Sequence, residues 1–215
     1  MPDATPIQRA IAFFDGQNLY HAAKDAFGYT WANYDPVLLA TAVCARHGWT
    51  LTETRFYTGI HTPWGNAYLN GFWKSKLAVL GRQPKVHIFT RSLRYRRKTI
   101  NLPNGSTHTF TTAEEKGVDV RLALDLVRLA MRAQYDVALV FSQDQDLSEA
   151  ADEVRAIATE QNRKIVTASA FPVSANSLNI RGINNTKWIP IDKVLYDTCI
   201  DHRDYRPKTA GGPNP

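Results

Sequence analysis

An uninterrupted apolar run, Ala10-Ile11-Ala12-Phe13-Phe14, ends abruptly at Asp15-Gly16 near the start of this chain. A strand that is apolar at every position belongs to a sheet covered on both faces, because a sheet with one solvated face would alternate apolar and polar residues. Further strands are expected at 51–60, 85–90, 137–141 and 164–170. Strands that alternate with helices predict an α/β fold with a doubly wound, mostly parallel sheet and helices on both faces.

Helical spacing of apolar residues predicts the helices between these strands. They are expected from about residue 17, and over 36–47, 66–80, 117–134, 147–161 and 192–200, with a short segment at 188–191. At 215 residues, the chain is long enough for one sizeable core, so a single domain is expected over 1–200. The basic, Pro/Gly-rich tail 201–215 is expected to be disordered.

Several classes of protein are excluded by composition. No apolar run approaches the roughly 18 to 20 residues that span a bilayer, and the residues before Asp15 lack the pattern of a secretory signal. We therefore expect a cytoplasmic protein with no membrane partner. Cys44 and Cys199 lie far apart in apolar-periodic stretches, which predicts buried free thiols and neither a disulfide framework nor a zinc site.

The basic residues are concentrated in the middle of the chain. Between Glu53 and Glu114 there is no acidic residue, while ten of the 26 basic residues lie there. The rest of the chain therefore carries 16 basic and all 20 acidic residues and is acidic on balance. A basic region of this kind favours a polyanionic partner, most often nucleic acid.

A β-hairpin is expected within this basic region, at about 91–112. Asn104-Gly105 lies between two β-prone segments, which is a strong short-range hairpin signal. Its basic side chains would meet phosphates and Tyr95 could stack on an unpaired base, the alternative being a solvated basic edge that discourages strand pairing. The residues predicted to bind nucleic acid are Arg91, Arg94, Tyr95, Arg96, Arg97 and Lys98. The other large aromatic residues are interpreted as core or groove walls: Trp31, Tyr34, Trp49, Trp64 and Trp73.

Four acidic residues are expected at one edge of the sheet. Asp15, Asp144 and Asp146 follow the ends of predicted strands, and Asp119 begins a helix at the same edge, which is where open α/β sheets bind ligands. Taken one at a time, three of these residues have a structural alternative. Asp15 could be an N-cap, and the helix dipole favours a carboxylate at the position of Asp119. Asp146 could form a capping box with Glu149. No cap explains Asp144.

Together these carboxylates require a cation, because like charges at close quarters repel and raise one another's pKa. Oxygen ligands with open positions favour Mg²⁺ or Mn²⁺ over zinc. Such a site can turn bound water into a nucleophile and neutralise the charge that develops on a phosphodiester.

Three segments resemble the signature blocks of the NYN domain family of the PIN-like nuclease superfamily: Phe13–Leu19, Glu115–Asp125 and Tyr135–Leu147. All three occur in order, and the resemblance covers the chain from about Ala10 to Ala170. It implies a PIN-like sheet of order 3-2-1-4-5. It also implies a metal-dependent endonuclease, usually acting on RNA, that leaves a 5′-phosphate and a 3′-hydroxyl.

The resemblance also implies roles for individual residues. Asp15, Asp119, Asp144 and Asp146 would hold the metal, and Asn18 would orient a ligand or touch the scissile phosphate. The supporting residues that it implies are Ser142, which would hydrogen-bond within the site, and Lys116, which would pair with a carboxylate or a phosphate. Asp125 matches as well, but it lies six residues past Asp119 and so points about 240° away around the helix, which favours a supporting or structural role.

The chain departs from the family pattern in three places. Leu147 stands where an aromatic residue is common, and Gln143 and Gln145 replace small residues. The stretch 174–186 lacks the acidic residue that relatives often carry late in the domain, which leaves the carboxyl-terminal wall of the site open, with Arg181 as a phosphate contact or a surface residue.

The leading hypothesis is an endoribonuclease that hydrolyses phosphodiester bonds with Mg²⁺ or Mn²⁺. The alternative is a non-catalytic module that binds RNA or DNA on the same fold. A phosphatase with an aspartyl nucleophile is disfavoured because Gln17 stands where its second acid would be, and dinucleotide-binding and P-loop motifs are absent from the sequence. RNA is thus the expected partner, and a homodimer is compatible with the sequence.

Overall fold

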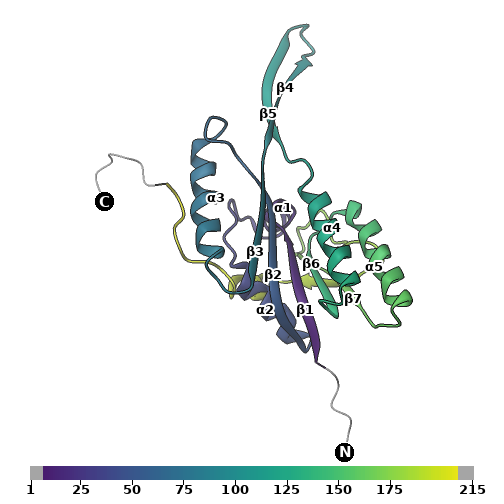
Figure 1. The fold of residues 1–215 in the computed structure, drawn as a ribbon. Helices are drawn as coiled ribbons and strands as arrows, with labels where there is room; N and C mark the ends of the chain where they lie inside the picture. Colours follow the sequence, from purple (N-terminus) through teal and green to yellow (C-terminus); the bar gives the residue numbers. More distant parts are fainter. Residues whose placement is uncertain (1–6, 208–215) are drawn as a thin grey trace, which may run out of the picture.

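The computed structural model describes residues 7–207 and contains a six-stranded sheet with a separate two-stranded hairpin (Figure 1). The order of the six strands is β3-β2-β1-β6-β7-β8, and every neighbouring pair is parallel. These strands are β1 (Gln8–Asp15), β2 (Trp49–Ile60), β3 (Val86–Ser92), β6 (Val137–Phe141), β7 (Val166–Pro172) and β8 (Lys187–Ile191). The predicted α/β fold with a parallel sheet flanked by helices is confirmed, and β8 adds a strand at one edge.

The helices form two layers, one on each face of the sheet (Figure 1). They are α1 (Gly16–Phe27), α2 (Pro36–Arg46), α3 (Ala67–Leu80), α4 (Val118–Met131), α5 (Ser148–Glu160) and α6 (Lys193–Asp197). In the described part of the chain, none of them is long and apolar enough to cross a membrane. Cys44 and Cys199 are buried free thiols, as predicted.

The residues of β1 explain why the sheet is covered on both faces. Successive side chains of a strand point to opposite faces, and Phe14 accordingly belongs to the core under α1, α2 and α3, while Phe13 belongs to the core under α4 and α5. Both rings are fully buried. The continuous apolar run therefore serves two separate cores, which is why it does not alternate.

A row of phenylalanines crosses the three central strands near their carboxyl ends. The register pairs Phe14 of β1 with Phe56 of β2 and with Phe141 of β6. The rings of Phe14 and Phe141 are stacked with centroids 4.0 Å apart, and Phe56 lies 6.1 Å from Phe14 on the other side. This packed row sets the level at which the next residues, Asp15 and Ser142, leave the sheet.

The hairpin is formed by β4 (Arg94–Asn101) and β5 (Thr107–Glu114) and projects from the carboxyl edge of the sheet (Figure 1). It runs over 94–114 rather than the expected 91–112, because Arg91 still belongs to β3. Its base is held by buried Leu93, whose N–H donates to Ile60 O at 2.9 Å. Its tip turns at Gly105, which has a left-handed φ of 82° that favours glycine.

The expectation of a disordered tail is wrong for residues 201–207, which pack along α3. Tyr205 is buried, its hydroxyl donates to Asp201 Oδ2 at 2.6 Å, and its ring meets Phe72 edge-on. Asp201 also pairs with Arg203 at 2.8 Å and with buried Lys76 at 3.5 Å. The polar groups in this tail satisfy one another, so composition alone was misleading. The rest of the predicted tail, 208–215, lies outside the described residues.

Asp201→Asn is expected to lower the free energy of unfolding by about 2–4 kcal/mol, because it leaves Lys76 buried without its carboxylate and weakens the bonds from Arg203 and Tyr205. Asp204→Asn is the matched control, since Asp204 pairs with Arg206 at the same 2.8 Å but in an exposed position. That change is expected to leave the free energy of unfolding close to that of the wild type, because an exposed ion pair contributes little to stability. Urea denaturation of both variants measures the difference, and equal losses would contradict this account.

Candidate active site

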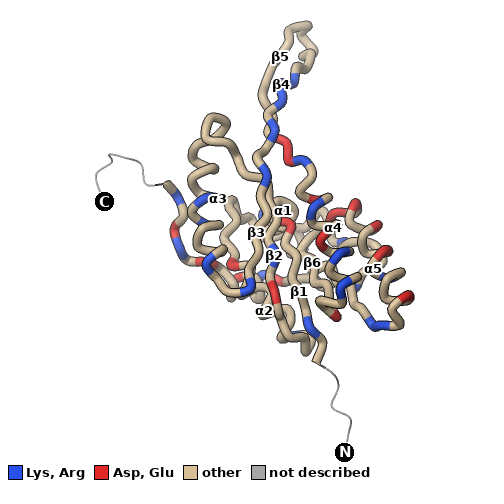
Figure 2. Tube along the Cα trace, viewed as in Figure 1, with Lys and Arg blue, Asp and Glu red and all other residues tan. Residues whose placement is uncertain are grey.

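Acidic side chains from three separate segments meet at the carboxyl edge of the sheet. Asp15 ends β1, Asp144 lies three residues after β6, and Asp119 lies in the first turn of α4. Figure 2 shows acidic residues also at the point where β5 leads into α4. The parallel register brings these segments together because strands β1, β2 and β6 all end at this edge.

Asp15 is a buried carboxylate at the start of α1. It is only 7% exposed, its Oδ1 accepts the N–H of Asn18 at 3.1 Å, and its Oδ2 accepts the hydroxyl of Ser142 at 3.2 Å. Burial, together with the charges of Asp144 and Asp119, raises the pKa of Asp15 to about 6 against the lowering effect of the two hydrogen bonds. Asp15 therefore does cap the N-terminus of α1, and it also lies close to other negatively charged carboxylates.

The loop after β6 is built around Ser142. Its hydroxyl donates to Asp15 and accepts the N–H of Asp144 at 3.1 Å, which links two of the carboxylates. Asp144 in turn accepts the N–H of Asp146 at 3.0 Å and caps the short 3₁₀ turn η1 (Gln145–Leu147). The interpretation that no cap explains Asp144 is wrong, because a 3₁₀ turn precedes α5 and moves the cap two residues toward the N-terminus.

The side chain of Asn18 joins α1 to the same loop. Its Oδ1 accepts the N–H of Gln143 at 2.9 Å, so the amide oxygen is used in holding the loop after β6 against α1. The start of α1 also lies close to β2, which Gly16 allows, since a Cβ there would lie 2.9 Å from the ring of Phe56. The structure thus gives Asn18 a positioning contact in addition to its predicted role toward ligand.

Glu115 belongs to the acidic cluster and was missed by sequence reasoning. Its Oε2 accepts the N–H of Gly59 at the end of β2, and a Cβ at Gly59 would lie 2.5 Å from that oxygen. Burial, together with the charges of Asp15 and Asp119, raises the pKa of Glu115 to about 7. Glu115 is the first residue of the second segment that resembles the NYN family, but its contact with Gly59 forms only in the folded chain.

The remaining predicted residues lie in less central positions. Asp146 is exposed beyond Asp144, and Lys116 is exposed and forms no ion pair with any described residue. Its carbonyl oxygen accepts a bond of 3.5 Å from Arg91 Nη1.

Asp125 is buried on the packing face of α4, away from the other carboxylates. Tyr57 donates to it at 2.9 Å, Arg121 at 3.1 Å and Arg55 at 3.4 Å. These contacts fasten α4 to β2. Asp125 thus has the structural role that its helical position favoured.

The two glutamines that replace small residues hold the wall of the site beyond β7. Gln143 Nε2 donates to the carbonyl oxygens of Asn179 and Arg181 at 3.1 and 2.9 Å. Gln145 Nε2 donates to Gly182 O at 3.0 Å. The loop that lacks an acidic residue is therefore fixed by amide side chains from the loop after β6.

The donor atoms of the cluster fit a hard divalent cation in kind. They are carboxylate and hydroxyl oxygens, which Mg²⁺ and Mn²⁺ prefer, and the charged neighbours that raise the pKa of Asp15 and Glu115 are themselves carboxylates. Within residues 7–207, no three His, Cys, Asp or Glu side chains form a preformed metal-binding group. The residues therefore fit a divalent cation by the type and charge of their donor atoms, and not by a preformed coordination geometry.

The family model for the NYN domain matches residues 9–178. The chain belongs to the NYN domain family. The match spans β1 through β7 and includes every segment of the acidic cluster. It places the chain among the nuclease-like domains of the PIN-like superfamily, which commonly use divalent metals.

Other comparisons say less about this NYN domain. No protein with curated function matches its sequence. The crystal structure of a protein of unknown function from Vibrio parahaemolyticus is similar, with a TM-score of 0.49 and 15% identity over 87% of this chain and 94% of that one. A likeness at this level says nothing about activity.

Replacing Asp15 by Asn is expected to stabilise the metal-free protein at neutral pH. The pKa of Asp15 rises from 3.8 to about 6, so between these values the folded chain keeps a proton that the unfolded chain releases. Stability therefore falls as pH rises through this window and stays lower above it. The shift corresponds to about 3 kcal/mol, and we expect a gain of about 1–2 kcal/mol, because the new amide nitrogen cannot accept the hydroxyl of Ser142.

Thermal unfolding in chelator at about pH 8 and about pH 4.5 measures this gain, which should disappear at the lower pH. Glu153→Gln changes an exposed carboxylate on α5 and should be neutral at both values. If the Asp15→Asn protein is less stable than wild type at about pH 8, repulsion and burial do not determine the contribution of Asp15 to stability.

Proposed function

We propose that this NYN domain is a divalent-metal-dependent endonuclease whose substrate is RNA. The observation that carries the proposal is the cluster of Asp15, Asp119, Asp144 and Glu115, in which burial and the neighbouring carboxylates raise the pKa of Asp15 and of Glu115. A fold tolerates such repulsion where a bound cation relieves it. Membership of a nuclease-like family supports the same reading.

Asp15, Asp119 and Asp144 would hold Mg²⁺ or Mn²⁺, with Asp146 at the outer side. When bound, the metal would lower the pKa of a water molecule and neutralise charge on the phosphate. Ser142 keeps Asp15 and Asp144 in place through its two hydrogen bonds. Asn18 holds the loop that carries Asp144 against α1.

Glu115 is suited to move a proton during the reaction. A group with a pKa near the working pH exchanges protons most effectively, and the pKa of Glu115 is raised to about 7. Its Oε2 is engaged by Gly59, whereas Oε1 is bonded to no other described residue and can hold the proton. The chain thus supplies a proton carrier beside the carboxylates that would bind metal.

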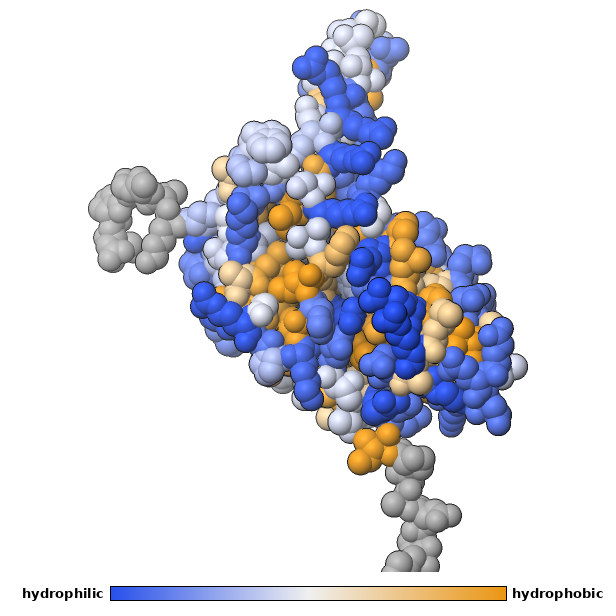
Figure 3. Space-filling view, in the orientation of Figure 1, coloured by the Kyte–Doolittle hydropathy of each residue, from blue (hydrophilic) through white to orange (hydrophobic). Residues whose placement is uncertain are grey.

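The basic hairpin supports RNA as the partner. Arg94, Arg96, Arg97 and Lys98 are all exposed on β4, and this shaft of the hairpin is strongly hydrophilic (Figures 2 and 3). Other basic residues of the central region are used inside the protein, among them Lys76. Tyr95 is set at the hairpin base, where its hydroxyl lies 2.9 Å from His61 Nδ1 and its ring covers Gly65, so it anchors the arm rather than standing free.

The test of catalysis is cleavage of labelled RNA and DNA with Mn²⁺, Mg²⁺ or chelator. Asp144→Asn and Asp119→Asn are each expected to lower the rate at least about tenfold to a hundredfold, since even supporting residues of metal sites cost that much. Glu153→Gln, an exposed change on α5, should cut like wild type.

A second candidate is a module that binds nucleic acid without cutting it, which the lack of a preformed metal-binding group among residues 7–207 favours. Tight binding that is indifferent to chelator, with no cleavage of any substrate, would establish this candidate and refute the enzyme.

Arg97→Ala is expected to weaken RNA binding and to reduce the slope of log K against log salt by about 1, as loss of one phosphate contact does. Lys98→Ala is the matched comparison on the same strand. Its Nζ is already paired with Glu114 at 2.7 Å, whereas Arg97 has no ion-pair partner among residues 7–207. The salt slope should change less for Lys98→Ala. Unchanged slopes for both variants would remove the hairpin from the binding surface.

A further inference from the structure

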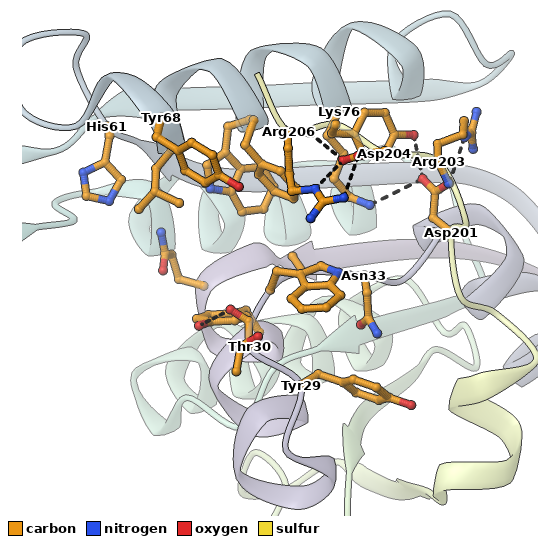
Figure 4. Close-up of a pocket in the computed structure, with 18 of the residues that line it drawn as sticks. Tyr29, Thr30, Asn33, His61, Tyr68, Lys76, Asp201, Arg203, Asp204 and Arg206 are labelled. Atoms are coloured by element: carbon orange, nitrogen blue, oxygen red, sulfur yellow. Dashed lines mark hydrogen bonds and ion pairs between the residues drawn. The ribbon is translucent and has the colours of Figure 1, made fainter. Parts of the chain in front are cut away.

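A cavity of about 1050 Å³ lies between α3, the loop that joins α1 to α2, and segment 201–206 (Figure 4). In the close-up, His61 and Tyr68 lie on one wall, and Thr30 and Asn33 face them across the gap. Pockets that hold a drug-sized molecule measure roughly 300–1,000 Å³. This cavity therefore has room for more than one group of the size of a nucleotide.

The walls of the cavity present aromatic rings that the core does not cover. Trp31 is 59% exposed and Tyr68 is 50% exposed, although each lines the cavity, while Phe72 and Trp73, which also line it, are buried. Aromatic rings on opposite walls of a groove are the usual means of holding unpaired bases, since every base has a flat face that can stack.

The charged groups of the cavity pair with one another and leave little net charge. Asp201 pairs with Arg203 and Lys76, and Asp204 pairs with Arg206. Burial lowers the pKa of His61, and with it the share of this ring that is charged near pH 7. The lining therefore suits the face of a base better than a phosphate.

One end of the cavity opens onto the acidic cluster. Glu115 is part of its lining, as is Gln17, which lies two residues after Asp15. Leu93 and Ala113, at the base of the hairpin, line it as well. A strand with bases in the cavity would thus have its backbone beside the first basic residue of β4, Arg94, and beside the carboxylates.

We propose that this cavity is a binding site for unpaired nucleobases, in which Trp31 and Tyr68 stack against the bases of a single-stranded nucleic acid. The inference rests on the proposed function in one respect, namely that the same strand passes the acidic edge. Paired bases are already stacked in a duplex and present no free face, so the site selects single strands over duplexes.

Binding is measured with the full chain carrying Asp144→Asn, using fluorescent single-stranded RNA and DNA of about ten nucleotides, a length within known site sizes. A blunt duplex and an abasic strand of the same length are the comparison probes. Trp31→Ala and Tyr68→Ala are each expected to weaken binding of the single strands at least about fivefold. The abasic strand should bind weakly and equally to parent and variants.

Trp64→Ala is the matched control, because Trp64 is 84% exposed but does not line the cavity. It should bind all probes like the parent, and thermal unfolding should show all three variants folded. The proposal is wrong if Trp31→Ala binds single strands as tightly as the parent, if Trp64→Ala loses as much, if the duplex shows the same dependence on Trp31, or if no strand binds.

Failure of the nuclease proposal is distinguishable from these outcomes. Wild-type protein that binds single strands through Trp31 but cuts none would leave the base-binding site intact and remove the catalytic role. Metal-dependent cleavage that is indifferent to Trp31 and Tyr68, together with unchanged affinity, would do the reverse.

Discussion

The stacked row of Phe56, Phe14 and Phe141 is the constraint on which the rest of the site depends. It fixes the parallel register of β2, β1 and β6, and a slip of one residue would turn every side chain of a strand to the opposite face. Because the row lies directly beneath the carboxyl ends of β1 and β6, the residues that follow it in these two strands leave the sheet at one level. Asp15 and Ser142 meet across two strands for this reason, and their hydrogen bond carries the order of the core into the acidic cluster.

The cluster is held at a cost in stability that its hydrogen bonds only partly offset. Ser142 and the N–H of Asn18 favour the charged form of Asp15, yet burial and the neighbouring carboxylates outweigh them and raise its pKa to about 6. Burial and the charges of Asp15 and Asp119 likewise raise the pKa of Glu115. Such strain at one edge of an otherwise well-packed sheet is characteristic of sites that bind a cation or exchange protons.

Residues 7–207 place three different surfaces around that edge. The hairpin offers exposed basic residues, the cluster offers oxygen ligands, and the cavity beneath α3 offers exposed aromatic faces. Glu115 belongs to both the cluster and the cavity, and Leu93 joins the cavity to the hairpin base. A single strand of nucleic acid that contacted all three surfaces would be held in one orientation. Its phosphates would meet the hairpin, its scissile bond the cluster and its bases the cavity.

By itself, the sequence determined the elements of the sheet and most of the cluster, because apolar periodicity and the position of Asp15 after a buried strand are local signals. It could not reveal Glu115, since that residue is identified only by its contact with Gly59, 56 positions away. It misjudged Asp144, whose cap depends on a 3₁₀ turn, and residues 201–207, whose charges pair with one another and with Lys76 of α3. Tertiary structure alone decided these features, because pairing and burial of polar groups depend on residues that are distant in sequence.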